Sequence, residues 1–135
     1  MKKTRNDYAK YRLESAKEKL NSAGVLLREN LFKDSLSRSY YAMFSAARAL
    51  LATKGFDSSK HSGVISLFNQ HFLKTNIMDR KIGKKLSEAK DFREAGDYED
   101  FFVVSKEDAE RQIQNAKEFI SEVEKILLNY TNLKI

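Results

Sequence analysis

Residues 34–54 read DSLSRSYYAMFSAARALLATK, and this stretch decides the fold. Its apolar side chains recur every three or four residues, from Leu36 through Tyr40 and Phe44 to Leu51, which is the spacing of one face of a helix. Alanines occupy much of the remaining surface, so neighbouring helices can approach closely. The stretch therefore predicts a helix that lies at the centre of the molecule.

Both ends of this central helix carry boundary signals. Asp34 is a residue type that caps a helix N-terminus. Gly55 is the type expected in the left-handed conformation just past a helix end, and Phe56 can fold back on the last turn in a Schellman arrangement. We therefore expect the helix to start at a cap on Asp34 and to stop at Gly55.

Two long amphipathic helices are predicted on either side of the central one. Apolar residues recur at steps of three and four over residues 8–30 and again over residues 109–127. Ser105 followed by Asp108 resembles a capping box for the last of these helices. The central helix is thus expected to be flanked by two helices that each present one apolar face.

The rest of the chain predicts two shorter helices and one unusual connection. One helix follows residue 61, and another runs over about residues 79–95 and stops at Gly96. The connection after Gly96 contains the apolar run of residues 101–104, Phe-Phe-Val-Val. The fold class is therefore all-α: a single domain over residues 1–135, built as an antiparallel up-and-down bundle of four to five helices.

Composition excludes several classes of protein. The chain has 135 residues, no cysteine and two histidines, which excludes a disulfide scaffold, a thiolate zinc site and a histidine-rich metal cage. The acids of residues 91–100 lack the alternating ligands and turn glycine of a calcium loop. No apolar run approaches the roughly 20 residues that span a bilayer. We expect a cytoplasmic protein with no membrane segment, metal or cofactor.

The positive charge is concentrated in one half of the chain. The net charge is +6; residues 1–61 hold 13 Lys and Arg against 6 Asp and Glu, whereas residues 62–135 hold 12 against 13. A basic surface attracts phosphate, so RNA or a nucleotide is a natural partner. The alternative is that the excess charge is only the solvated face of a helical bundle.

Two groups of polar residues near the central helix are candidates for binding. Arg38, Tyr41, Ser45 and Arg48 form a polar ladder on an otherwise apolar helix. For Arg48 we prefer a structural role, in which it pairs with a carboxylate or reaches water. His61 lies at a predicted helix start, where backbone N–H groups favour an anion; taken alone, a capping role is the preferred explanation, because polar residues at a helix start are routine.

The sharpest local group is Arg93, Asp97 and Tyr98. Arg93 occupies a position on the apolar stripe of its predicted helix, where an aliphatic residue is the simple choice. The alternative is an Arg93–Asp97 ion pair that fixes the helix end. We expect Arg93 to contribute more to ligand binding than to stability.

Three strings taken together resemble one family. They are residues 39–51 (SYYAMFSAARALL), residues 61–63 (HSG) and residues 93–98 (REAGDY), and in this order and spacing they resemble the HEPN domain, a nucleotide-binding helical domain. The resemblance covers about residues 8–128. It implies a five-helix bundle, commonly a homodimer, often encoded beside a minimal nucleotidyltransferase as a toxin–antitoxin pair.

The resemblance also implies chemistry for particular residues. HEPN ribonucleases need no metal and carry an arginine that is followed, after four to six residues, by a histidine; Arg93 matches the arginine, but Tyr98 stands where the histidine is expected. The chain thus resembles the branch that lacks this histidine, and the proton transfer would fall to Tyr98 or to His61. In some HEPN toxins the partner transferase attaches AMP to a tyrosine beyond the motif, for which Tyr98 is the nearest candidate.

Three hypotheses follow. The first is a HEPN-like protein that binds RNA or a nucleotide through Arg93, Asp97 and Tyr98, with Arg38, Tyr41 and His61 as weaker members, and that works with a nucleotidyltransferase. The second is an active metal-independent endoribonuclease that uses Arg93 with Tyr98 or His61. The third is a non-catalytic adaptor that binds other proteins. In each case we expect a homodimer, because the apolar run at residues 101–104 is typical of an interface.

Overall fold

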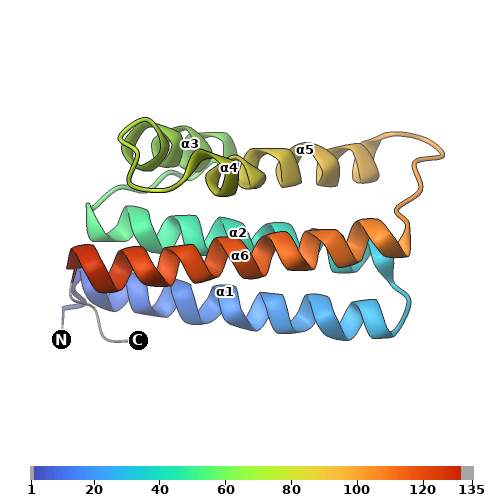
Figure 1. Ribbon diagram of the computed structural model, residues 1–135, viewed down its shortest axis with the longest axis horizontal. Coiled ribbons are helices and arrows are strands. Elements are labelled where there is room, and N and C mark those ends of the chain that lie inside the picture. Colours follow the sequence, from blue (N-terminus) through green and yellow to red (C-terminus); the bar gives the residue numbers. More distant parts are fainter. Residues whose placement is uncertain (1, 132–135) are drawn as a thin grey trace.

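The computed structural model describes residues 2–131, with side chains through residue 129, and all regular structure in this part of the chain is helical (Figure 1). Five helices have eight residues or more, which confirms the predicted all-α bundle. The elements in chain order are α1 (Arg5–Arg28), α2 (Phe32–Thr53), α3 (His61–Phe68), the π-helical turn η1 (Asn69–Leu73), the single turn α4 (Arg80–Gly83), α5 (Lys85–Tyr98) and α6 (Lys106–Thr131).

The predicted central helix is central in the structure. Helices α1, α2 and α6 run lengthwise beside one another, and α3, α4 and α5 form a shorter layer on one side of them (Figure 1). Helix α2 packs against α1, α6, α5 and α3. Of its 22 residues, 14 are buried. The long apolar helix therefore holds both layers together, and burial of its side chains is the main source of stability. In the described part of the chain, no helix is long and apolar enough to cross a membrane.

Two of the predicted helix boundaries are confirmed. Gly55 has φ 76°, its N–H donates to Ala52 O at 3.0 Å, and the N–H of Phe56 donates to Leu51 O at 3.0 Å, which is the Schellman arrangement. At the start of α6, Ser105 and Asp108 exchange two hydrogen bonds of 3.0 Å between side chain and backbone, which is the capping box.

The prediction that Asp34 caps α2 is wrong. The helix begins two residues earlier, at Phe32, and its cap position is Leu31, which makes no side-chain capping bond. Asn30 turns the chain with φ 61°, and the N–H of Ser35 already donates to Leu31 O at 2.9 Å. Asp34 lies inside the first turn, where the helix dipole favours an acid.

The prediction of one helix over residues 79–95 that stops at Gly96 is wrong in two respects: the helix is interrupted, and it ends later. Lys84 separates α4 from α5, with a ψ of −13° that departs from helical geometry. Helix α5 then continues through Gly96 to Tyr98. Gly96 does not stop the helix; it lies buried within α5, with Lys33 and Phe102 beside it. The residue that turns the chain is Phe101, with φ 62°.

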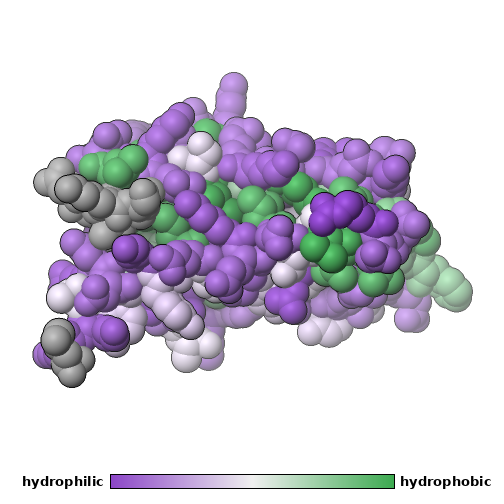
Figure 2. Space-filling view, turned by 90° about the horizontal axis from the view of Figure 1, so that it is seen from below, coloured by the Kyte–Doolittle hydropathy of each residue, from purple (hydrophilic) through white to green (hydrophobic). Residues whose placement is uncertain are grey.

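The apolar run at residues 101–104 is divided between core and surface. Phe102 packs edge-on against Phe92 with ring centroids 5.6 Å apart, and Val104 is buried. Phe101 is 100% exposed and Val103 is 81% exposed. From the α1 side the molecular surface is mostly hydrophilic, with a hydrophobic projection at the end where the α5–α6 connection lies (Figure 2).

Candidate functional site

Arg93 of α5 lies against two adjacent tyrosines of α2. Its guanidinium carbon is 4.9 Å from the ring centroid of Tyr41 and 5.8 Å from that of Tyr40. Its Nε donates to Ser37 Oγ at 3.4 Å, and Nη2 is 3.4 Å from Asp97 Oδ2. The side chain remains 22% exposed. The guanidinium is therefore held by aromatic and polar contacts at the surface, with hydrogen-bond capacity left for an anion.

His61, the first residue of α3, lies against the same tyrosines. Its Nδ1 is 3.0 Å from the hydroxyl oxygen of Tyr40, and its ring centroid is 4.3 Å from that of Phe44 and 5.7 Å from that of Tyr41. Burial, and secondarily the positive charges of Arg93 and Lys90, lower the pKa of His61 below its ordinary value. The ring is therefore neutral at neutral pH and can accept a proton.

Tyr40 is the link between Arg93 and His61. It is fully buried, and burial raises the pKa of its hydroxyl well above the ordinary value, so the group stays protonated. The hydroxyl shares its hydrogen bond with Nδ1 of His61, and no residue in the described range bonds to Nε2. We call Arg93, Tyr40, Tyr41 and His61 the Arg93 cluster.

The structure brings some of the predicted site residues together and separates others. Arg93, Asp97, Tyr41 and His61 are in one place. Tyr98 is 81% exposed at the end of α5, and within residues 2–129 it forms no hydrogen bond, ion pair or ring contact with Arg93. It stands five residues beyond Arg93 on a continuous helix, so it faces another direction.

The two arginines of the α2 ladder differ in their surroundings. Arg38 is exposed and shares a hollow with Tyr41 and Ser37. Arg48 makes a two-point contact with the carboxylate of Asp57, at 2.8 and 3.2 Å, which confirms the structural pairing that the sequence favoured. Asp57 belongs to the loop after α2 rather than to a neighbouring helix.

Tyr40 and Ser37 are site residues that the sequence analysis missed. Tyr40 was assigned only to the apolar face of α2. The available signal was its hydroxyl, because a buried tyrosine needs a hydrogen-bond partner. The acids in the same region are engaged with neighbouring bases: Glu94 pairs with Lys90 at 2.8 Å, and Asp97 with Arg93. In residues 2–129, no three acids or histidines gather as a metal site would require.

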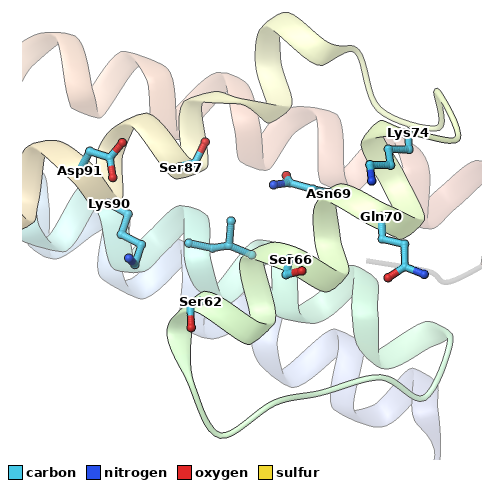
Figure 3. A pocket seen from close by; sticks show the side chains of 9 residues that line it. Ser62, Ser66, Asn69, Gln70, Lys74, Ser87, Lys90 and Asp91 are labelled. Atoms are coloured by element: carbon cyan, nitrogen blue, oxygen red, sulfur yellow. The ribbon is translucent and has the colours of Figure 1, made fainter.

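A polar groove lies next to the Arg93 cluster. One of its walls is formed by α3 and η1, and the other by α5. Ser62 and Ser66 line it from α3, Asn69 and Gln70 from η1, and Ser87 and Lys90 from α5 (Figure 3). Ser62 follows His61, and Lys90 lies one turn before Arg93. The cluster thus adjoins a surface of hydroxyl, amide and ammonium groups, the types that contact sugars and phosphates, together with the carboxylate of Asp91.

Chemically, the Arg93 cluster suits a phosphate ester with an attached base. A guanidinium binds phosphate oxygens through two parallel N–H bonds. Tyr41 offers an aromatic face that is partly exposed, and His61 offers a neutral nitrogen. The arrangement can bind a nucleotide, and a base next to a bound phosphate can also accept a proton.

Comparison with known proteins agrees with the fold and the motif strings. The profile of the HEPN domain matches residues 9–126. A protein of Methanocaldococcus jannaschii with the name "putative toxin" is 33% identical over 122 residues, which cover 90% of this chain and 83% of the relative. A UPF0332 protein of Thermotoga maritima is 35% identical over 112 residues, covering 83% of this chain and 85% of the relative. A UPF0332 protein of Pyrococcus horikoshii is 44% identical over 78 residues, covering 58% and 55%.

Proposed function

Since the chain belongs to the HEPN domain family, we propose that it is a cytoplasmic, toxin-like HEPN protein whose Arg93 cluster binds RNA or a nucleotide. The toxin role is supported by the names of two relatives from Methanocaldococcus jannaschii. The binding role is supported above all by one observation: Arg93 is 22% exposed and lies 4.9 Å from the ring of Tyr41, beside a neutral His61. In this function Arg93 holds a phosphate and Tyr41 contacts a base or ribose.

One observation also favours the ribonuclease alternative. His61 lies across the two tyrosines from Arg93, so the cluster holds both an arginine and a histidine although they come from different helices. In such a reaction Nε2 of His61 accepts the proton of the ribose 2′-hydroxyl. The oxygen attacks the adjacent phosphorus, the 5′-oxygen leaves and takes a proton from water, and a 2′,3′-cyclic phosphate remains. Arg93 stabilises the charge on the phosphoryl oxygens.

The exposed end of α5 and the connection after it suit protein partners. We propose a homodimer formed through Phe101 and Val103, because both side chains project from the surface. We also propose a minimal nucleotidyltransferase as partner, with Tyr98 as its AMP acceptor. Tyr98 is 81% exposed, so its hydroxyl oxygen can reach an activated α-phosphate.

RNA binding by matched variants tests the proposal. The fluorescence anisotropy of a 5′-labelled single-stranded RNA is followed with the wild type, Arg93→Ala and the control Arg80→Ala. Arg80 is an exposed arginine of α4 that forms no ion pair within the described structure. We expect salt-dependent binding that Arg93→Ala weakens and Arg80→Ala retains. Equal affinity of the two variants would contradict the role of Arg93.

Cleavage separates the ribonuclease alternative from binding alone. Labelled RNA is incubated with the wild type, His61→Ala and Tyr98→Phe in the presence of a metal chelator. The alternative requires cyclic-phosphate products that disappear with His61→Ala and persist with Tyr98→Phe. Intact RNA in the presence of a wild type that binds it leaves binding as the function of the cluster.

A further inference from the structure

A second basic surface lies along the seam between α1 and α2. Here a groove of about 590 Å³ is lined by Tyr8, Tyr11, Arg12 and Lys19 from α1 and by Arg48 from α2, among others. We call it the seam groove. It shares no lining residue with the Arg93 cluster, and the sequence analysis assigned no function to the residues that α1 contributes.

The cations that line the seam groove outnumber its acids: Lys3, Lys10, Arg12, Lys19 and Arg48 stand against Asp7 and Glu14. Asp57 is the one carboxylate that pairs with Arg12 and Arg48, at 3.2 and 2.8 Å. Lys19 donates to the hydroxyl of Ser15 at 2.6 Å, and within residues 2–129 neither Lys10 nor Lys19 forms an ion pair. The groove lining therefore carries a net positive charge, and two of its cations, Arg12 and Arg48, share one carboxylate.

The pKa values of these cations are consistent with this imbalance. Burial, and secondarily the charge of Arg48, lower the pKa of Arg12 below its ordinary value. Burial, and secondarily Arg38, also lower the pKa of Lys19. A bound anion would favour the charged form of Arg12 and of Lys19, because it adds an attractive charge where these side chains otherwise meet like charges.

Two tyrosines at the groove indicate what kind of anion fits. Tyr8 is 49% exposed, with the guanidinium carbon of Arg12 5.7 Å from its ring centroid, and Tyr11 is 72% exposed. Aromatic side chains beside cations in a groove are the combination that binds single-stranded nucleic acid, because exposed bases stack on the rings while phosphates meet the cations. In a duplex the bases are already stacked and cannot do this.

The seam groove is connected to the Arg93 cluster along α2. Arg38 shares a hollow with Tyr41 of the cluster. Arg48 shares another hollow with His61. Arg38 and Arg48 are ten residues apart on one helix, a distance of about 15 Å. A short single strand can therefore contact both surfaces at once.

We propose that the seam groove is a binding surface for single-stranded RNA, with Lys10, Lys19 and Arg48 on the phosphates and Tyr11 stacked on a base. This inference rests on the proposed function, because it assigns the path of an RNA that also reaches Arg93. It goes beyond that function in naming the strandedness of the ligand and the residues of α1 that bind it.

A matched pair of double variants tests the phosphate contacts. Lys10→Gln with Lys19→Gln removes two groove cations, and Arg80→Gln with Lys81→Gln removes two cations that are exposed on α4. We measure the affinity for a labelled single-stranded RNA at several salt concentrations. The groove variant should bind more weakly than the control and lower the salt slope by about 1.4, since each phosphate contact on a single strand contributes about 0.7.

Folding is checked on the same proteins. Because the groove cations repel one another, the groove variant should melt at the temperature of the wild type or above it. A melting temperature far below the wild type would assign the two residues a structural role and overturn the proposal.

Base stacking is tested separately with Tyr11→Ala. This variant should bind the RNA roughly five- to a hundredfold more weakly, the scale of one lost stacked base, and should bind inorganic polyphosphate as the wild type does. Equal loss on both probes would contradict stacking. If the groove variant loses affinity for vesicles that contain phosphatidylserine but keeps its affinity for RNA, the surface binds lipid and the proposal is wrong.

The two proposals fail in different ways. If Arg93→Ala weakens RNA binding and the groove variants match their control, the seam groove is wrong and the proposed function stands. If the groove variants weaken binding and Arg93→Ala does not, the groove stands and the assignment of the Arg93 cluster is wrong. A wild type that binds no RNA overturns both.

Discussion

Replacing Arg93 by alanine should cost more in binding than in stability, and the structure allows both costs to be worked out. Its ion pair with Asp97 is partly exposed and joins two residues four apart on the same helix. Such a pair is worth about 0.3–0.5 kcal/mol. Its contact with Tyr41 at a partly exposed position adds about 0.5–1 kcal/mol. The Ser37 contact is long, at 3.4 Å, and adds little. The total loss of stability is therefore about 0.8–1.5 kcal/mol.

The expected loss in binding is larger, about 1–3 kcal/mol, because Arg93→Ala removes a charge-assisted bond to phosphate. The loss of stability corresponds to a melting temperature lower by only a few degrees for a domain of this size. Anisotropy with labelled RNA and thermal unfolding followed by circular dichroism measure the two quantities on one protein preparation.

Asp97→Ala supplies the control that separates the two roles. It removes the ion pair but leaves the guanidinium on Tyr41, so it should lower stability slightly and retain or tighten RNA binding, since one negative charge near the phosphate is gone. If Arg93→Ala and Asp97→Ala destabilise the protein to the same large extent and both keep full RNA affinity, then Arg93 serves only to fix the end of α5 and the reasoning is wrong.

Three further predictions concern the rest of the site and its surroundings. The folded state lowers the pKa of His61 below the unfolded value of about 6.5, so acidification from pH 7 through that value should reduce the free energy of unfolding. His61→Asn should remove this part of the pH dependence. Identical pH profiles of the wild type and this variant would contradict the prediction. Phe101→Asp should convert a dimer into a monomer in light scattering while circular dichroism still shows the folded helical protomer, because the side chain is fully exposed in the single chain; a wild type that is monomeric at micromolar concentration would contradict the dimer. Co-expression with a cognate nucleotidyltransferase should add the mass of AMP to the wild type and not to Tyr98→Phe; an equal addition to both proteins would place the acceptor elsewhere.

Local signals in the sequence predicted much of the fold. The apolar faces of α2, the stop at Gly55 and the capping box at Ser105 are each written in neighbouring residues, and the structure has all three. The predicted stop at Gly96 is wrong, because a glycine ends a helix only where the chain turns, and α5 continues to Tyr98. Phe102, which packs beside Gly96, depends on tertiary packing that the local pattern does not contain.

The candidate site was predicted less well, for the same reason. Spacing along the chain put Tyr98 beside Arg93, but on a continuous helix five residues turn the side chain away. His61, 32 positions before Arg93, reaches the site because α3 and α5 both pack on α2. Tyr40 then joins the two residues through its ring and its hydroxyl. Contacts of this kind follow from how helices pack together and have no signature in residue spacing.

Photocrosslinking tests most directly whether RNA lies on the Arg93 cluster. Single-stranded RNA that contains 4-thiouridine is irradiated with the wild type and with Arg93→Ala, and the crosslinked tryptic peptides are identified by mass spectrometry. We expect crosslinks in two peptides: residues 39–48, which hold Tyr40 and Tyr41, and residues 61–74, which begin with His61. The yield of both crosslinks should be lower with Arg93→Ala. Crosslinks confined to peptides of α6, at the same yield in both proteins, would contradict it.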